Sequence, residues 1–336
     1  MKIGIIGLPL AGRLTVFEAL TRQAGDPGSR SEDRLAVVRV PDERVDILSR
    51  MFEPQKTIYA QVEYLLPGVG SQKREQNPWL PVKECEALIL VVRNHGAERR
   101  PQADFTAVDQ ELILSDLVQV EKRLERLELD HRRGKKMNPE EHQLLSDCRK
   151  LLEGEIPLRH RPGMADAKLL RGFTLLTAKP MLAVFNNEED DPAVPELGEV
   201  AGRERCLVLR GKLEQDLSRM SPEEVGDFMA EYDIGASAMD RMIRLSYEVL
   251  GLASFFTVGS DEVRAWTVRQ GTPAVEAAGV IHTDIQKGFI RAEVIAYDDL
   301  MAAGSMAEAR RRGTVRLEGK TYVVADGDII NFRFNV

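Results

Sequence analysis

The chain has few cysteines and histidines and contains no long apolar segment. Its three cysteines, Cys85, Cys148 and Cys206, and its five histidines do not recur at the spacing of a metal site. We interpret the cysteines as reduced, mostly buried thiols. No apolar run approaches the roughly 20 residues that span a bilayer, and the N-terminus shows no signal-peptide pattern. We therefore expect a cytoplasmic protein with no membrane partner.

The charge of the chain excludes another class of function. A formal net charge of −8 is unsuited to indiscriminate nucleic-acid binding by the whole surface, although it is compatible with a local basic groove. We therefore expect no DNA partner. Apolar residues at 43% and charged residues at 30% are typical of a soluble globular protein. At 336 residues the chain is too long for one core of ordinary size, which predicts two or three domains.

Residues 7–15 have the glycine spacing of a phosphate-binding loop. The pattern is G-x-x-x-x-G-K-[ST], and an apolar strand at 2–6 precedes it while a helical pattern follows. Arginine stands at the lysine position and leucine at the hydroxyl position. The candidate nucleotide-binding residues of this loop are Gly7, Leu8, Pro9, Leu10, Ala11, Gly12, Arg13, Leu14 and Thr15.

The two replacements change the chemistry of the loop unequally. Backbone N–H groups and the start of the following helix bind phosphate oxygens whatever the side chains are. Arg13 keeps the positive charge, although its planar fork is not equivalent to a lysine. Leu14 cannot bind magnesium, and Thr15 points about 100° away on a helix. The alternative is a tight strand–turn–helix with no ligand.

The remaining apolar runs predict one doubly wound parallel sheet. Each run is short and apolar, as in strands of a parallel sheet, and helical segments such as 42–51 separate the runs. The predicted strands are 2–6, 35–40, 62–66, 87–92, 181–185 and 206–209.

A helical hairpin is predicted between these strands. Its first apolar seam is formed by Ile113, Leu117, Val120, Leu124 and Leu127, and its second by Leu144, Leu145, Cys148, Leu151 and Leu152. Asn138 and Pro139 resemble a helix start. The basic turn at 132–136 is either a solvated tip or a nucleic-acid contact.

The sequence pattern of the last part of the chain is typical of a small α+β module. Short β-rich runs broken by glycine turns predict strands at 264–268, 290–296, 314–317 and 321–324, and a terminal strand within 326–336.

Several of these segments together resemble a known family, the YchF-type P-loop proteins of the Obg-related branch of translation-factor GTPases. The resemblance is strongest at 263–268, 279–284, 287–293 and 326–336, and it includes 41–46 and 54–57. It implies a P-loop domain at 1–104 and 171–251, a helical-hairpin insertion at 105–170, and a C-terminal TGS domain of β-grasp, ubiquitin-like fold at 252–336.

The resemblance also implies residues that read the base. Asn186 and Glu189 match the family's Asn-x-x-Glu, which implies ATP rather than GTP, although the residues themselves leave both open. Gly211 and Lys212 stand in the family's base loop, where Glu214 remains but the usual serine is absent.

Other positions depart from the family. The family's Asp-x-x-Gly motif orders magnesium and the γ-phosphate. In this chain Leu65 stands in place of the aspartate, and the glycine is retained as Gly68. The first switch segment, 25–33, and the stretch at 69–78 are shortened. We therefore expect poor magnesium binding, no catalytic or metal-ligating residues, and ATP or GTP bound weakly.

These features predict a degenerate nucleotide-binding protein that acts as a ribosome- or RNA-associated regulator of translation or of a stress response. The candidate RNA contacts are Arg264, Lys287 and Arg291, which recur among aromatic and apolar residues. Two alternatives remain: a slow P-loop ATPase or GTPase, and a nucleotide-free scaffold for a protein partner.

Overall fold

The chain folds into two compact units. A computed structural model describes residues 1–22, 32–68, 78–198, 200–221, 223–225, 228 and 237–335, so most of the two shortened segments, 25–31 and 69–77, lies outside the described residues. The first unit comprises Met1–Val37 and Glu63–Met242, and the second comprises Val38–Val62 and Ile243–Val336. In the described ranges no helix is long and apolar enough to cross a membrane.

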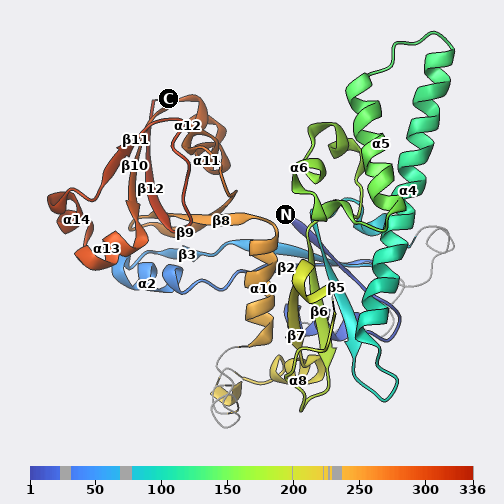
Figure 1. Ribbon diagram of the computed structural model, residues 1–336. Helices are drawn as coiled ribbons and strands as arrows, with labels where there is room; N and C mark the ends of the chain where they lie inside the picture. The colour runs from blue at the N-terminus through green and yellow to red at the C-terminus, as the bar shows by residue number, and fades with distance from the viewer. Residues whose placement is uncertain are drawn as a thin grey trace. The chain divides into compact units, whose positions relative to one another are not determined.

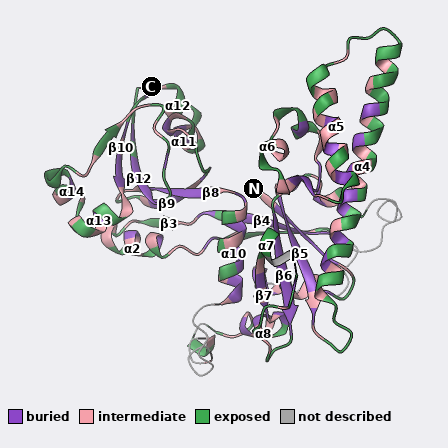
Figure 2. Cartoon of the chain, in the orientation of Figure 1, coloured by how far each residue is buried: buried purple, intermediate pink, exposed green. Residues whose placement is uncertain are grey.

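A six-stranded sheet organises the first unit (Figure 1). Its order is β2-β4-β1-β5-β6-β7, and the pairs β1–β4, β1–β5, β5–β6 and β6–β7 are parallel. The strands are β1 (Lys2–Ile6), β2 (Arg34–Arg39), β4 (Gln61–Leu66), β5 (Ala87–Asn94), β6 (Met181–Asn187) and β7 (Arg205–Leu209). β5 and β6 are buried along almost their whole length, as Figure 2 shows in purple. The predicted doubly wound α/β sheet and its six strands are confirmed, and the four strand pairs named above are parallel.

Short helices complete this unit. They are α1 (Arg13–Thr21), α6 (Pro162–Ala165), α7 (Val200–Arg203) and α8 (Gly211–Leu217), with the 3₁₀ turns η2 (Leu80–Val82), η3 (Leu158–His160) and η4 (Lys168–Phe173). α10 (Ala238–Val249) begins in the first unit and ends in the second.

The helical hairpin consists of α4 (Pro101–Arg132) and α5 (Pro139–Glu153). Both predicted seams pack into one cluster, in which Ile113, Val120, Leu124, Leu145, Cys148 and Leu152 are buried. Asn138 caps α5, because its side chain accepts hydrogen bonds from the backbone N–H groups of Glu140 and Glu141.

A buried carboxylate fixes α4 to the body of the first unit. Asp116 is fully buried, and it accepts hydrogen bonds from Leu176 N (3.0 Å), Thr177 N (2.7 Å) and Thr177 Oγ1 (2.6 Å). Burial raises the pKa of the Asp116 carboxyl, while the hydrogen bonds from Thr177 and Leu176 oppose that rise. The hairpin therefore has a fixed attachment point as well as an apolar seam.

The second unit has its own six-stranded sheet, in the order β11-β10-β12-β8-β9-β3. β10 pairs antiparallel with β11 and β12, β8 pairs antiparallel with β9, and β12–β8 is parallel. The strands from this end of the chain are β8 (Leu252–Val258), β9 (Glu262–Arg269), β10 (Phe289–Ala296), β11 (Arg316–Glu318) and β12 (Asp328–Phe334). The helices are α11 (Ala274–Ile281), α12 (Thr283–Lys287), α13 (Tyr297–Ala303) and α14 (Met306–Arg312).

In this unit one sequence prediction fails and one strand was missed. No strand forms at 321–324, where Val323 makes only an isolated bridge to Pro273. The strand β8 was not predicted, although its buried Phe255 and Phe256 make it a central strand of the sheet. The β-grasp, TGS assignment of the unit stays a prediction.

A segment from the N-terminal half completes the second sheet. Residues 38–62 contain α2 (Glu43–Phe52) and β3 (Lys56–Ile58), and β3 pairs parallel with β9. The sequence-based domain limits, 1–104 and 252–336, had assigned this segment to the P-loop domain. The three-domain division as a whole stays a prediction.

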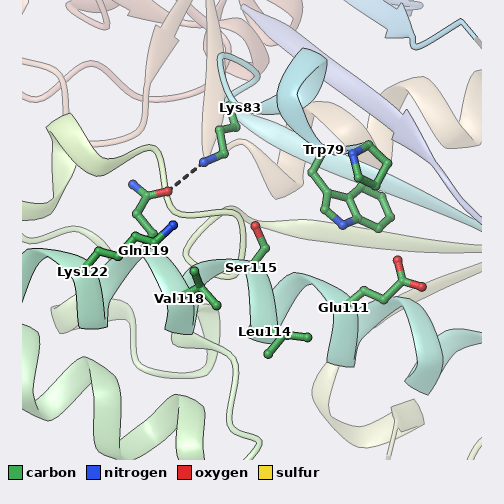
Figure 3. Close-up of a pocket in the computed structure, with 9 residues that line it drawn as sticks. Trp79, Lys83, Glu111, Leu114, Ser115, Val118, Gln119 and Lys122 are labelled. Atoms are coloured by element: carbon green, nitrogen blue, oxygen red, sulfur yellow. Dashed lines mark hydrogen bonds between the residues drawn. The ribbon is translucent and has the colours of Figure 1, made fainter. Parts of the chain in front are cut away.

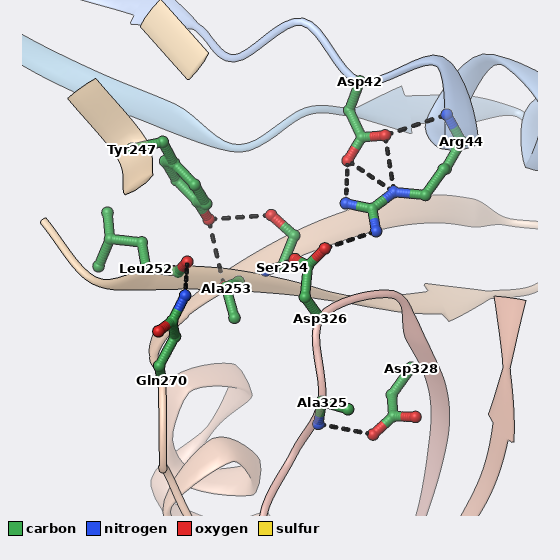
Figure 4. Close-up of polar contacts among 10 residues, drawn as sticks. All are labelled: Asp42, Arg44, Tyr247, Leu252, Ala253, Ser254, Gln270, Ala325, Asp326 and Asp328. Atoms are coloured by element: carbon green, nitrogen blue, oxygen red, sulfur yellow. Dashed lines mark hydrogen bonds and ion pairs between the residues drawn. The ribbon is translucent and has the colours of Figure 1, made fainter. Parts of the chain in front are cut away.

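Charged side chains hold this segment within its unit (Figure 4). Asp42 caps α2, and the Arg44 guanidinium binds both Asp42 (2.8 Å) and Asp326 (2.7 Å). Asp326 also accepts a hydrogen bond from Ser254 N at 2.8 Å. Burial lowers the pKa of Arg44, but the two carboxylates outweigh it, and the net pKa is raised. Arg44 therefore stays charged.

We expect Asp116→Ala to lower the free energy of unfolding by about 3 kcal/mol, because two N–H groups and a hydroxyl lose their acceptor in a buried place. Urea unfolding measures the change. Asp147→Ala on the exposed face of α5 is the matched control, and it should leave the unfolding midpoint close to that of the parent protein. Equal midpoints for both variants would contradict the anchoring role of Asp116.

Candidate functional site

The predicted phosphate-binding loop joins β1 to α1 and has a strained backbone. Gly7 (φ 150°) and Gly12 (φ 89°) take conformations that side chains disfavour. A Cβ at Gly7 would collide with the carbonyl oxygen of Val91, and one at Gly12 with the Asn186 amide. Leu10 is also left-handed (φ 68°), at a cost of ~1 kcal/mol. The loop therefore keeps its shape although Leu10 is poorly suited to it.

This loop forms one wall of a cavity of about 440 Å³. Residues Leu8 to Leu14 line it on one side, and the other lining residues are Glu32, Arg34, Leu66, Pro67 and Gly68. The N-cap of α1 is Gly12, which offers no side-chain acceptor to the first-turn N–H groups. These donors and the positive end of the helix dipole favour an anion in the cavity.

Arg13 gives the cavity a half-buried positive charge. Burial lowers the pKa of its guanidinium, which nevertheless stays protonated because the pKa of arginine lies far above neutral pH. Within the described ranges Arg13 makes no hydrogen bond or ion pair. A phosphate would supply the missing partner.

The part of the site where a magnesium ion would have to bind is apolar. Leu14 lines the cavity, and Leu65, 7% exposed, packs in a core cluster with Ile6 and Val92. In the described part of the chain no group of three or more His, Cys, Asp or Glu side chains could hold a metal ion. The residues present at 14 and 65 therefore do not fit a magnesium ion.

Asn186 joins the phosphate loop to the predicted base loop. At the end of β6, its buried amide donates to Ala11 O (3.0 Å) and accepts from Gly211 N (3.0 Å). A Cβ at Gly211 would clash with the same amide. The structure thus brings Asn186, Gly211 and the loop together, and it gives Asn186 a structural task.

The other base-loop residues are already paired with protein groups. Lys212 Nζ lies 2.6 Å from Glu189 Oε1, with both side chains largely exposed, and this pairing raises the pKa of Lys212. Glu214 is buried, and it accepts hydrogen bonds from Ser237 Oγ and Ala238 N (both 3.0 Å) at the start of α10. Glu214 therefore caps a helix.

The candidate RNA contacts differ in whether their charged groups already contact other side chains. The Arg264 guanidinium lies 3.8 Å from the centroid of the Trp266 ring and 3.9 Å from the Glu262 carboxylate. Lys287, at the end of α12, and Arg291, on β10, are exposed, and neither forms an ion pair with a described residue. Lys287 and Arg291 are therefore the better candidates for a phosphate backbone.

Sequence reasoning missed a hollow of about 520 Å³ beside α4 (Figure 3). Trp79 and Lys83 face the helix there, and Lys83 Nζ donates to Gln119 Oε1 at 2.7 Å. The available signal was the pair Leu114 and Val118, one helical turn apart and outside the apolar seam, which are 61% and 40% exposed.

Comparisons with known proteins extend over the whole chain. The family model YchF-GTPase_C, described as "Protein of unknown function (DUF933)", matches residues 252–335. "Ribosome-binding ATPase YchF" of Bacillus subtilis (strain 168) is 38% identical over 100% of both chains. The protein of the same name from Escherichia coli O157:H7 is 34% identical over 100% of this chain and 99% of its own. A solved structure, "Structure of the Schizosaccharomyces pombe YchF GTPase", has a TM-score of 0.83 at 27% identity and covers 99% of this chain and 97% of that one.

We expect Asn186→Ala to lower the free energy of unfolding by about 2 kcal/mol and to speed amide hydrogen exchange in residues 8–16, because both buried hydrogen bonds to the loops are lost. Glu189→Gln, three residues later on the surface, serves as the control and should change neither quantity. Unchanged exchange in the loop of the Asn186 variant would show that the amide does not hold it.

Proposed function

This chain belongs to the YchF family, and on that premise we propose that it binds a nucleotide without magnesium, hydrolyses it weakly or not at all, and associates with the ribosome or with RNA. The observation that carries the proposal is the cavity beneath the phosphate loop, where Arg13 and backbone donors remain while Leu14 and Leu65 replace metal-binding residue types.

Phosphate binding rests on the backbone of the loop. The conformations of Gly7, Leu10 and Gly12 persist, so the loop still surrounds a site at the N-terminus of α1. Arg13 adds a charge that can form two hydrogen bonds to phosphate oxygens. These groups support binding of the phosphate chain by charge and backbone donors alone.

Weak hydrolysis follows from the same residues. P-loop catalysis consists of positioning and of charge stabilisation by magnesium and the loop lysine. Losing one oriented donor typically costs about 3 kcal/mol, or 10²–10³ in rate. In this chain Leu14 and Leu65 both remove polar groups from the metal side, so we expect turnover near the uncatalysed rate.

Recognition of the base would involve Glu189 and Lys212. Their ion pair is solvent-exposed and therefore weak, so a base could displace it at little cost. The family's Asn-x-x-Glu pattern favours ATP over GTP. The Glu189 carboxylate would accept a hydrogen bond from a base N–H group.

A slow ATPase or GTPase is the second candidate, because Arg13 retains the charge of the loop and has no partner among the described residues. Single-turnover measurements with excess protein separate the two candidates. A magnesium-dependent turnover rate that falls sharply in Arg13→Ala would favour the enzyme, whereas equal, near-background rates would favour the binding protein.

Ribosome or RNA association is supported by the relatives and by two exposed cations. Two relatives of comparable length carry the name "Ribosome-binding ATPase YchF". In this chain Lys287 and Arg291 are exposed, and neither forms an ion pair with a residue that the structure describes. Exposed lysines and arginines of this kind bind phosphate backbones without reading sequence.

We expect the dissociation constants of ATP and GTP to change less than about tenfold between magnesium and chelator, because neither Leu14 nor Leu65 can bind the ion. Isothermal titration calorimetry under both conditions measures this. A larger gain in affinity with magnesium would show that the site binds the metal through other groups.

We expect Lys287→Ala combined with Arg291→Ala to weaken co-sedimentation with ribosomes and to reduce the salt dependence by about one unit of slope per lost phosphate contact. Arg311→Ala combined with Lys320→Ala removes the same charge elsewhere in the second unit and is the control. An equal loss in both double variants would indicate a net-charge effect and would reject the proposed contact surface.

A further inference from the structure

We propose that the hollow beside α4 is a docking surface for a second copy of this chain, with the two α4 helices antiparallel to each other. The hollow has no part in the proposed function, so this inference does not depend on nucleotide or ribosome binding. It rests on the apolar side chains at the hollow and on the placement of charges at the two ends of α4's lining.

The hollow exposes an apolar strip. Leu114 and Val118 line it from α4, and both side chains are largely exposed. On the opposite side Trp79 is half-buried and faces the helix (Figure 3), and the next residue, Leu80, is 55% exposed. Exposed apolar side chains that are grouped in this way, unlike single scattered ones, mark contact sites.

Charges of opposite sign stand at the two ends of this strip. Glu111 lies one helical turn before Leu114, and Lys122 one turn after Val118, so the four residues share one side of α4. Glu111 and Lys122 are exposed, and within the described ranges neither forms an ion pair. The third charge of the hollow, on Lys83, is held by the Gln119 amide at 2.7 Å.

This order of charges is complementary to itself. In a symmetric dimer, residue i of one copy faces residue j of the other, and j faces i. When two α4 helices lie antiparallel with the dyad at the centre of the strip, Glu111 of each copy faces Lys122 of the other, and the apolar residues meet between two ion pairs. A parallel pair would place like charges together and is disfavoured.

The size of the surface predicts a weak dimer. Only Pro78, Trp79, Lys83, Glu111, Leu114, Ser115, Val118, Gln119 and Lys122 line the hollow. A stable interface involves roughly 20–30 residues on each side. Exposed ion pairs add little affinity and mainly set the orientation and the choice of partner. We therefore expect a dissociation constant on the order of 100 µM.

Sedimentation velocity over a concentration series of the full chain tests this. Glu111→Lys and Lys122→Glu each place like charges across the proposed interface. An equimolar mixture of the two variants restores both ion pairs, because one copy then carries lysine at both ends of the strip and the other carries glutamate. Asp166→Lys and Lys136→Glu make the same charge changes at exposed positions elsewhere in the first unit and are the matched controls.

We expect each of the two charge reversals on α4 to weaken self-association about tenfold, and their mixture to return to within about threefold of the parent protein. Leu114→Ala combined with Val118→Ala keeps the charges and removes the apolar contact, and it should also weaken self-association about tenfold. Both control variants, alone and mixed, should match the parent protein.

Three results would overturn the proposal. One is a parent protein that stays monomeric up to about 1 mM. Another is a dimer whose strength neither charge reversal on α4 changes, or whose mixture is no stronger than either variant alone. The third is a chain that stays monomeric while ribosomes slow amide hydrogen exchange between Glu111 and Lys122, because the surface then binds a different partner.

Discussion

The buried amide of Asn186 is the contact on which the candidate nucleotide site depends. It bonds to Ala11 in the phosphate loop and to Gly211 at the start of α8, so two loops from distant parts of the chain share one hydrogen-bonding group. Gly12 and Gly211 must both lack a side chain to let the amide approach. Such a contact lets the loops keep their backbone shape whatever side chains stand at positions 14 and 65.

The parts of this site that the sequence predicted are those that backbone geometry requires. Gly7 and Gly12 were recognisable because positive φ values need glycine, and the central strands β1, β5 and β6 because buried parallel strands are continuous apolar runs. The ion pair between Glu189 and Lys212 could not be predicted, because it depends on side-chain rotamers. The hydrogen bond that Gly68 N donates to Asp33 Oδ1 depends on which strands become neighbours, which is a tertiary property.

The errors in the second unit have a similar origin. The run at 321–324 has β-forming residues, but only Val323 finds a bridging partner. β3 has three residues and no useful periodicity, and it forms because β9 offers it an edge. Family membership, by contrast, was recognisable from motifs spread over the chain, because the relatives align along its full length.

The pairing of β3 with β9 makes the second unit discontinuous in sequence. A fragment that begins near residue 243 would contain the residues matched by the C-terminal family model, but it would lack α2, β3 and the Arg44 link to Asp326. The edge of β9 would then be open to pairing with another chain, a known route to aggregation. Residues 38–62 leave the first sheet at β2 and return to it at β4, so the two units could not be separated by a single cut without leaving one of them incomplete.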